Sequence, residues 1–506
     1  MPHLTRKVAT ACLVGAFIVG ALSPALAQST PPAAFARTAP APALSPSAPI
    51  TLTPAQADLL RQALVDSDRH GFEPGEFAPS GPGDAALIDA TIRYARAVRT
   101  GRLALSGFRD DWGLRPQPFD ARAGLARAVF DNQVEAWLKS LPPDFPGYEN
   151  LQQGLVTYRT LRERGGWQSL AEGPDLKVGS TGFAVEALRA RLAIEDPSVP
   201  AQVARTQPAA PAASATPPAP GQPPAPVIAP GQPLYDQALA DAVKRAQKRM
   251  GLEPSGVVGT ATRAALNIPV QRRIDQIVAN MERWRWLPRA MPADRVQVNV
   301  AAGILTLFKN DQPTLSMRAV TGRPNGGETP LLTSTIDNIV LNPPWNVPAG
   351  IAAKELLPKG RAYLASAGFR ILPGGGLQQA PGPRSALGLI KFDFQNPYAV
   401  YLHDTPSKGG FARYSRTASH GCVRLEKPLA LARAIMEGDP VWTPEVIDAT
   451  IAGGKTTRAP VARPVAVFLL YWTAYVTPDG QVNFRQDPYG WDTLLIQRIA
   501  AQGRTA

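Results

Sequence analysis

The chain has 506 residues, a length that predicts more than one domain, and its 44% hydrophobic content is enough for ordinary folded cores. The 53 prolines and 43 glycines gather in particular tracts, which indicates linkers between domains. The formal net charge of +13 favours an anionic partner. We see no nucleic-acid-binding motif and no cluster of basic and aromatic residues, so we expect no nucleic acid partner.

Residues 1–27 predict an export signal. Arg6 and Lys7 precede an apolar run from Val8 to Leu22, and Ala25-Leu26-Ala27 offers a cleavage site of small residues. The run is short for a membrane span, so we expect a periplasmic protein, cleaved after Ala27, with no stable membrane span. Residues 28–50 are rich in alanine and proline and predict a flexible tether.

Residues 51–170 predict a helical domain. Thr53 is a candidate N-cap for the first helix, and a stripe of apolar residues at helical spacing marks a later one: Tyr148, Leu151, Leu155, Tyr158 and Leu161. His70 is expected at the surface beside a helix end. We expect this domain to be structural and to carry no chemistry.

Residues 171–270 predict a second, smaller helical domain. Val185, Leu188 and Leu192 recur at helical spacing. Residues 197–233 interrupt it with a run rich in proline and alanine, which buries too little apolar surface to fold and predicts a solvated insertion.

Residues 271–493 predict a third domain built on strands. Val296, Val298 and Val300 alternate with polar residues, as in a half-buried strand. A segment at about 343–385 looks like an insertion, and Gly374-Gly375-Gly376 indicates mobility there. We expect residues 494–506 to be a C-terminal tail.

One cysteine and two histidines lie close together in the sequence. Of 2 cysteines, Cys12 lies in the leader, so Cys422 is the thiol expected in the mature chain. Two of the 4 histidines, His403 and His420, lie nearby in sequence. His403 ends a predicted strand, Tyr398–Leu402, and a thiol near an imidazole predicts a nucleophile with a general acid/base.

The residues around Cys422 extend this hypothesis. Gly421 allows close backbone approach to a substrate, and the N–H groups of Gly421 and Cys422 are candidate oxyanion donors. A lone cysteine is more often a buried small hydrophobe. A zinc site of His403, His420 and Cys422 is disfavoured, because no second cysteine and no familiar ligand spacing is available. We expect no metal and no organic cofactor.

The motif Ser419-His420-Gly421-Cys422-Val423-Arg424-Leu425, with His403-Asp404-Thr405-Pro406 upstream, resembles the signature of the L,D-transpeptidase (YkuD-type) catalytic domain. The separation of 422 − 403 = 19 residues fits the large periplasmic members. Further blocks agree in order: Pro381-Gly382-Pro383, Lys391-Phe392, Tyr471-Trp472-Thr473-Ala474 and Asp487-Pro488-Tyr489-Gly490. The two N-terminal domains resemble that family's scaffold and peptidoglycan-binding domains.

This resemblance implies a multidomain α+β chain. Its parts are a helical scaffold, a small three-helix peptidoglycan-binding domain, and a mixed β-sandwich-like catalytic domain with a lid insertion. The implied activity joins peptidoglycan tetrapeptide stems, as donor and acceptor, while the binding domain holds glycan strands. Cys422 forms a thioester, D-alanine leaves with a proton from His403, and a second stem amine gives a 3–3 cross-link. Carbapenems are expected to acylate Cys422. The other motif residues, Arg424, Ser419, His420 and Tyr401, are expected to support the loop or to contact substrate.

Two departures from the family pattern keep alternatives open. Leu389 stands where relatives often have arginine, and Ala246 stands where they often have an aromatic residue. A cysteine hydrolase of the L,D-carboxypeptidase type, D-amino-acid exchange and attachment of a protein to peptidoglycan need the same nucleophile. A non-catalytic peptidoglycan-binding protein is the other alternative. The group that orients His403 does not follow from the sequence, although in this family it is often a backbone carbonyl.

Overall fold

The computed structural model describes residues 49–200, 233–477 and 479–503. The predicted export signal, almost all of the predicted tether and most of the predicted insertion at 197–233 lie outside the described residues. Within the described ranges, no helix combines the length and the apolar character that crossing a membrane requires.

The first region is helical. Thr53 caps the first helix as the sequence predicted, since its hydroxyl accepts from the Gln56 N–H while the Gln56 side chain accepts from the Thr53 N–H. Leu60, Leu87 and Leu125 lie in the shared core. The elements are α1 (Pro54–Val65), η1 (Asp66–His70), α2 (Asp84–Thr100), η2 (Leu105–Gly107), α3 (Ala121–Phe130), α4 (Val134–Ser140) and α5 (Pro146–Glu163).

His70 is buried, and the prediction of a surface position was wrong. Its side chain is 5% exposed, and its Nδ1 lies 3.1 Å from the Tyr148 hydroxyl. The η1 turn ends at Gly71, whose φ of 82° reverses the chain and directs the imidazole inward. Burial, with the positive charge of Arg285 as the second cause, lowers the pKa of His70 to about 3, so this histidine is neutral.

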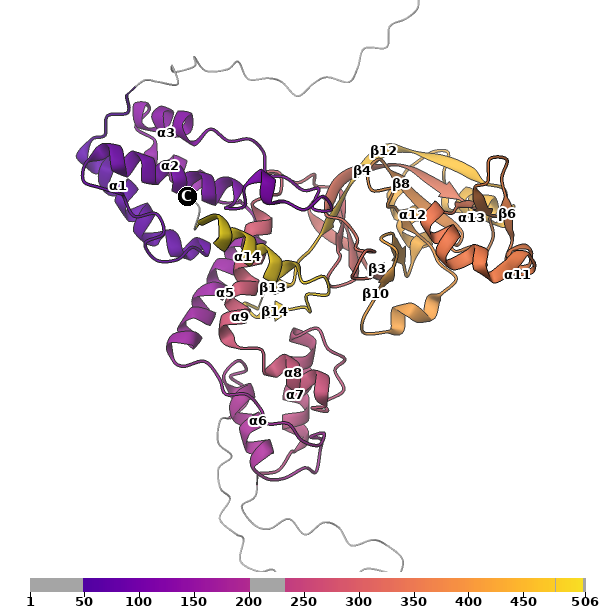
Figure 1. Ribbon diagram of the computed structural model, residues 1–506, viewed down its shortest axis with the longest axis horizontal. Helices are drawn as coiled ribbons and strands as arrows, with labels where there is room; N and C mark the ends of the chain where they lie inside the picture. Colours follow the sequence, from indigo (N-terminus) through magenta and orange to yellow (C-terminus); the bar gives the residue numbers. More distant parts are fainter. Residues whose placement is uncertain (1–48, 201–232, 478, 504–506) are drawn as a thin grey trace, which may run out of the picture. The chain divides into compact units, whose positions relative to one another are not determined.

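Helices α5 and α9 (Val270–Trp284) lie side by side (Figure 1) and join regions that are far apart in sequence. Tyr148 and Leu155 of α5 pack against Ile277 and Met281 of α9 and against Phe484 in a single core cluster. The last helix of the N-terminal region therefore packs with the C-terminal part of the chain. The segment after α2 also packs with a distant part of the chain. Its apolar residues lie in the main core of the strand-rich region: Leu103, Phe108, Trp112 and Leu114.

The second helical region contains α6 (Phe183–Ala193), α7 (Gln237–Arg249) and α8 (Thr260–Leu266). Val185, Leu188, Val243 and Leu266 form its core. Gln247 is 1% exposed; its side chain donates to the Val257 carbonyl at 2.9 Å and accepts from the Gly256 N–H at 2.9 Å. This amide fixes the loop between α7 and α8. Ala246, at the position of the family's aromatic residue, is buried in the same core.

Nine strands of the third region form one sheet in the order β10-β3-β11-β9-β8-β4-β12-β1-β2, and a further pairing of β2 with β3 closes it on itself. The expected sandwich-like architecture is therefore one closed sheet, and apolar side chains of its strands, such as Val298, Phe392 and Phe468, belong to the main core cluster. The strands are β1 (Arg295–Asn299), β2 (Ile304–Lys309), β3 (Gln312–Gly322), β4 (Leu332–Leu341), β8 (Ile390–Phe394), β9 (Leu402–His403), β10 (Thr417–Ser419), β11 (Val423–Leu425) and β12 (Thr457–Leu470).

The segment expected as an insertion folds as a small unit between β4 and β8. Its core is Val347, Ala352, Leu356, Leu364 and Leu377. Strands β5 (Trp345–Asn346), β7 (Leu377–Gln379) and β6 (Phe369–Ile371) pair in that order. The helical pieces are α10 (Ala349–Ile351), the single π turn η3 (Ala352–Leu356), η4 (Leu357–Lys359) and α11 (Gly360–Ser366).

The C-terminal residues differ from the predicted tail. Helix α14 (Trp491–Gly503) covers most of residues 494–506, and Leu495 is fully buried in the main core, together with Ile499 at 9% exposure. A tail was inferred because no motif falls there, but the apolar spacing of Trp491, Leu495 and Ile499 is helical. The remaining elements are η5 (Lys408–Ala412), α12 (Pro428–Ile435), α13 (Pro444–Ala452), β13 (Ala474–Val476) and β14 (Val482–Phe484).

A buried ion pair joins α9 to the N-terminal region. Arg285 lies 2.8 Å from Glu282, and both side chains are fully buried. Glu282 also accepts from the N–H groups of Arg102 and Leu103, at 2.7 and 3.1 Å. Arg285 donates to the Tyr148 hydroxyl at 2.9 Å. The two charges are paired, so removing one member leaves the other buried without its counter-charge.

We expect Glu282→Gln to lower the free energy of unfolding by about 3 kcal/mol, because Arg285 stays buried and loses its charge partner. Chemical denaturation followed by tryptophan fluorescence measures this. Lys139→Gln is the matched control, since it removes one member of a solvent-exposed pair with Glu135, and it should leave the transition unchanged. An equal stability of the Glu282→Gln and control proteins would contradict a role of this pair in joining the regions.

Candidate active site

Three neighbouring strands bring the sequence-predicted residues together. In β8 and β9, Lys391 is opposite His403; in the parallel pair of β9 and β11, His403 is opposite Arg424. Paired positions share a face of the sheet, as do residues two apart on one strand. Tyr401, His403, Cys422 and Arg424 therefore occupy one face, with Cys422 beside Tyr401 and diagonal to His403.

The Cys422 thiol is free and partly buried. Burial raises its pKa above the ordinary value, although hydrogen bonding with Tyr401 and the positive charges of Lys391 and Arg424 oppose this. The thiol is thus protonated at neutral pH, and since the thiolate is the nucleophile, a base must remove the proton during attack.

His403 has the form that such a base needs. Its side chain is 4% exposed, and its Nδ1 lies 2.5 Å from the Asp404 carbonyl oxygen. A carbonyl only accepts, so Nδ1 carries the hydrogen and Nε2 is left as the acceptor. Burial, then the charge of Arg424, lowers the pKa of His403 to about 3. The imidazole is neutral over the physiological pH range.

The Asp404 carbonyl is the orienting group that the sequence left open. The Asp404 side chain serves another purpose: one carboxylate oxygen accepts from the Leu389 N–H at 2.9 Å, and the other pairs with Lys408 at 2.5 Å. Leu389, at the position of the family's arginine, packs partly buried against the core and adds no charge. The aspartate thereby fixes the backbone that carries the carbonyl.

The loop before Cys422 is held by hydroxyl groups. Ser419 Oγ accepts from the Gly421 N–H at 3.1 Å and donates to the Cys422 carbonyl at 2.6 Å. Thr329 Oγ1 donates to the Gly421 carbonyl at 2.8 Å. Gly421 adopts φ 118°, a value that side chains disfavour. The Gly421 N–H donates to Ser419 in this structure, and its role as an oxyanion donor stays a prediction. The Cys422 N–H has no acceptor among the described residues.

The cationic side chains of Lys391 and Arg424 lie near the thiol and differ in their own partners. Lys391 is paired with Asp393 at 2.6 Å and lies 4.3 Å from the centre of the Tyr401 ring. Arg424 is half-buried, and burial lowers its pKa, yet its guanidinium makes no hydrogen bond or salt bridge with any described residue. Arg424 therefore offers an unpaired guanidinium on the same face as Cys422, a geometry suited to binding a carboxylate.

His420 connects the loop to the insertion. Its Nε2 lies 2.7 Å from Glu355 Oε1 in η3, and Glu355 lies 3.6 Å from Arg323. The hydrogen bond with His420 is the main cause that lowers the pKa of Glu355. The His420 side chain therefore contacts the insertion, and this position does not favour a role as the base.

Within the described ranges, no group of three or more His, Cys, Asp or Glu residues is placed to hold a metal ion.

The sequence placed Asp404 in the motif around His403 and Lys391 in a family block before it, and Glu328-Thr329-Pro330 resembles the family's entry to the active site, but none of these residues received a specific role. The role of the Asp404 carbonyl leaves no side-chain signal. The contacts of Thr329 and Glu355 with the loop join residues 92 and 65 positions apart, so only the fold reveals these contacts, and the sequence did not identify Glu355. Lys391 was visible only as part of the strand before His403.

Comparison with known proteins agrees with this geometry. The sequence model of the L,D-transpeptidase catalytic domain (YkuD) matches residues 293–443. This chain carries an L,D-transpeptidase catalytic domain. A scaffold domain matches residues 48–155, and a domain described as "Putative peptidoglycan binding domain" matches residues 230–266. The resemblance drawn from the Cys422 motif is thus confirmed.

The individual proteins to which this chain is similar have low sequence identity to it. A protein of Haemophilus influenzae named "Putative L,D-transpeptidase" is 33% identical over 243 residues, which cover 44% of this chain and 48% of that protein. The chain thus spans about half of its relative's length. Crystal structures of L,D-transpeptidases from Stackebrandtia nassauensis and Xylanimonas cellulosilytica align with 13% and 17% identity. They cover 60% and 59% of this chain and 96% and 98% of theirs, at TM-scores of 0.22 and 0.19. We draw no conclusion from structural similarity at that level.

We expect Arg424→Gln to shift the acid limb of Cys422 acylation to higher pH. Arg424 lowers the pKa of His403, so removing its charge raises that pKa, and protonated His403 cannot act as base. Acylation of the wild-type thiol by a carbapenem should stay level between pH 7 and 5 and decline only towards pH 3. Intact-protein mass spectrometry at each pH gives the rates.

Arg433→Gln is the control for this experiment, because Arg433 of α12 forms a surface pair with Asp448 of α13. Its pH profile should match the wild type. A wild-type midpoint near 6.5 would contradict the lowered pKa of His403, and a coincident profile for Arg424→Gln would contradict its cause.

Proposed function

We propose that this protein is a peptidoglycan L,D-transpeptidase in which Cys422 is the nucleophile and His403 the general acid/base. The observation that carries the proposal is the hydrogen bond from His403 Nδ1 to the Asp404 carbonyl. It leaves Nε2 free to accept a proton on the face of the sheet where Cys422 lies.

The reaction proceeds in two acyl transfers. His403 Nε2 takes the thiol proton as sulfur attacks the amide carbonyl before the terminal D-alanine of a tetrapeptide stem. The carbon–nitrogen bond breaks, D-alanine leaves as an amine protonated by His403, and a thioester remains on Cys422. A side-chain amine of a second stem then attacks the thioester and His403 accepts its proton. The product is a 3–3 cross-link, and the thiol is regenerated with that proton.

Two groups are positioned to assist. The Cys422 N–H, which has no acceptor among the described residues, donates to the developing oxyanion. The unpaired Arg424 guanidinium binds a stem carboxylate and thereby aligns the donor. Ser419 and Tyr401 position the loop and the thiol, since each hydrogen-bonds to Cys422.

The basic net charge of +13 suits a polymer whose stems carry carboxylates, and the domain matching 230–266 is proposed to hold glycan strands. Peptidoglycan lies outside the cytoplasm, so the protein is proposed to be exported to the periplasm.

We also propose that the insertion from Trp345 to Gln379 is a lid over the substrate groove. Glu355 contacts both His420 of the catalytic loop and Arg323, so the insertion is tied to the loop by a hydrogen bond and to Arg323 by charge. Its own small core lets it move as a unit relative to the sheet.

The test of the function is mass spectrometry on wild-type and Cys422→Ala proteins, each incubated with a disaccharide-tetrapeptide muropeptide. A 3–3 dimer and free D-alanine, formed only by the wild type, are expected. Loss of D-alanine without a dimer would instead assign hydrolysis through the same thioester. An unchanged muropeptide, together with no mass added to the wild type by a carbapenem, would overturn the catalytic proposal.

We expect Glu355→Gln to loosen the lid, because the amide keeps a hydrogen bond to His420 but loses the charge that attracts Arg323. At pH 6, alkylation of Cys422 by iodoacetamide should accelerate severalfold, as measured by mass spectrometry. Lys354→Gln, a neighbouring change with no contact to the loop, is the control. Equal alkylation rates in all three proteins would rule out a lid held by Glu355.

A further inference from the structure

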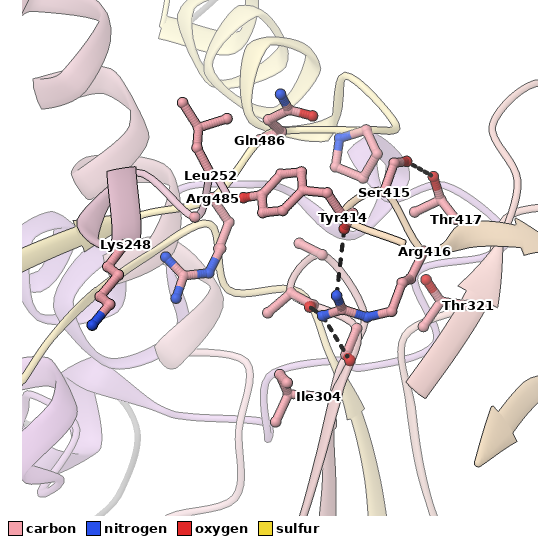
Figure 2. A pocket seen from close by; sticks show the side chains of 15 residues that line it. Lys248, Leu252, Ile304, Thr321, Tyr414, Ser415, Arg416, Thr417, Arg485 and Gln486 are labelled. Atoms are coloured by element: carbon pink, nitrogen blue, oxygen red, sulfur yellow. Dashed lines mark hydrogen bonds between the residues drawn. The ribbon is translucent and has the colours of Figure 1, made fainter. Parts of the chain in front are cut away.

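A cavity of about 370 Å³ lies where the second helical region meets the closed sheet (Figure 2). Its walls come from the end of α7 and the turn after it, from the turn between β1 and β2, from the segment before β10, and from the segment after β14. Its volume is within the range of small-molecule sites. None of Tyr401, His403, Cys422 or Arg424 lines it, so it is separate from the proposed catalytic groups.

The described residues that line the cavity make it positively charged and include no carboxylate. Lys248, Arg416 and Arg485 line the cavity from three different segments, as Figure 2 shows, and none of the residues lining it is Asp or Glu. The remaining polar groups are hydroxyls and one amide, those of Thr321, Tyr414, Ser415, Thr417 and Gln486. Such a surface attracts an anion that also carries groups able to hydrogen-bond.

The two guanidinium groups are fixed by neutral acceptors. Arg416 donates to the carbonyls of Ala302 and Tyr414, at 2.8 and 3.4 Å. Arg485 donates to the carbonyls of Arg249 and Phe484, at 3.3 and 2.7 Å. Within the described part of the chain, neither forms a salt bridge, so their charges are held in place without being neutralised.

Lys248 is exposed at the end of α7, and its ammonium forms no hydrogen bond or salt bridge with a described residue. Gly251 lets this region approach the side chains of Arg485 and Tyr414 closely. A Cβ at Gly251 would lie 2.6 Å from the Arg485 side chain and 2.8 Å from the Tyr414 hydroxyl, and its φ of 65° disfavours a side chain as well. The lysine and the two arginines therefore meet around one space.

The cavity also adjoins the strand that leads to the nucleophile. Arg416 and Thr417 line it, and Thr417 begins β10, which precedes Gly421 and Cys422. The Thr321 N–H donates to the Arg416 carbonyl at 2.8 Å, which ties this wall to β3. One ligand in the cavity would touch both the helical region that matches a peptidoglycan-binding domain and the segment entering the catalytic loop.

We propose that this cavity binds the carboxylates of a peptidoglycan stem peptide that is not the one being cleaved, and thereby holds the polymer against both regions. The proposal rests on the proposed function for the identity of the polymer. The lining of the cavity requires an anionic, hydrogen-bonding ligand; stem carboxylates with their adjoining amides meet both requirements. Electrostatic attraction to three cations makes the binding dependent on salt.

The test uses the full-length Cys422→Ala protein, which cannot consume the probe. A fluorescent disaccharide-tripeptide muropeptide is titrated at low and at physiological salt, beside the same muropeptide with its carboxylates amidated. Lys248→Gln, which removes a charge, and Gln486→Glu, which adds an opposing carboxylate at an exposed position, should each raise the Kd for the native muropeptide roughly threefold to tenfold. Their Kd for the amidated form should match the parent protein's.

Lys244→Gln is the matched control. Lys244 lies on the same helix, is paired with Asp241 at 3.0 Å and does not line the cavity, so its variant should bind like the parent. The proposal is overturned if Lys248→Gln and Gln486→Glu bind like the control, or if they weaken native and amidated muropeptides equally. Carbapenem acylation of the wild-type thiol, measured alongside, reports on the catalytic proposal alone, so the two can fail separately.

Discussion

The buried ion pair of Arg285 and Glu282 lies at the C-terminal end of α9, the helix that contacts the other regions of the described chain. Helix α9 reaches the second helical region through Arg273, which donates to the Ala265 carbonyl at 3.0 Å. It reaches the C-terminal segment through Arg283, which pairs with Asp492 at 2.6 Å, and through Gln276, which donates to the Thr473 carbonyl. These contacts are buried and polar, so they are specific in a way that apolar packing alone is not. The relative placement of the helical regions and the sheet follows from satisfying these charges.

A second buried group of paired charges connects α5 to the second helical region. Glu195 is buried, accepts from the Tyr158 hydroxyl at 2.5 Å, and pairs with Arg191 and Arg249 at 2.6 and 2.9 Å. Burial alone would raise the pKa of this carboxyl, yet the two arginines lower it to about 2. Arginine thus supplies the connections at several junctions, while the apolar clusters fill each region from within. Strands β8, β9 and β11 do not take part in these connections, and Arg424 on their shared face has no hydrogen-bond or salt-bridge partner among the described residues.

Much of the candidate site followed from local sequence, because a short motif encodes a short loop. The Cys422 motif and His403 identified the catalytic domain, and Thr53 identified a helix start, since each signal lies within a few residues. Contacts between distant positions did not follow. The interior place of His70 depends on Tyr148 and Arg285, the engagement of the Gly421 N–H depends on how Ser419 turns, and α14 is ordered by burying Leu495 in a core formed mostly by other segments. The predicted export signal and the proline-rich insertion remain predictions.

The insertion between β4 and β8 has a property that follows from strand register. Its first and last strands meet, with Trp345 opposite Gln379, while Leu341 of β4 is opposite Ile390 of β8. The chain therefore leaves the sheet and returns to it at almost the same point, and the insertion buries a core of its own. Such a segment is exchangeable. Evolution or an engineer can lengthen, shorten or replace it while the two flanking strands keep their pairing.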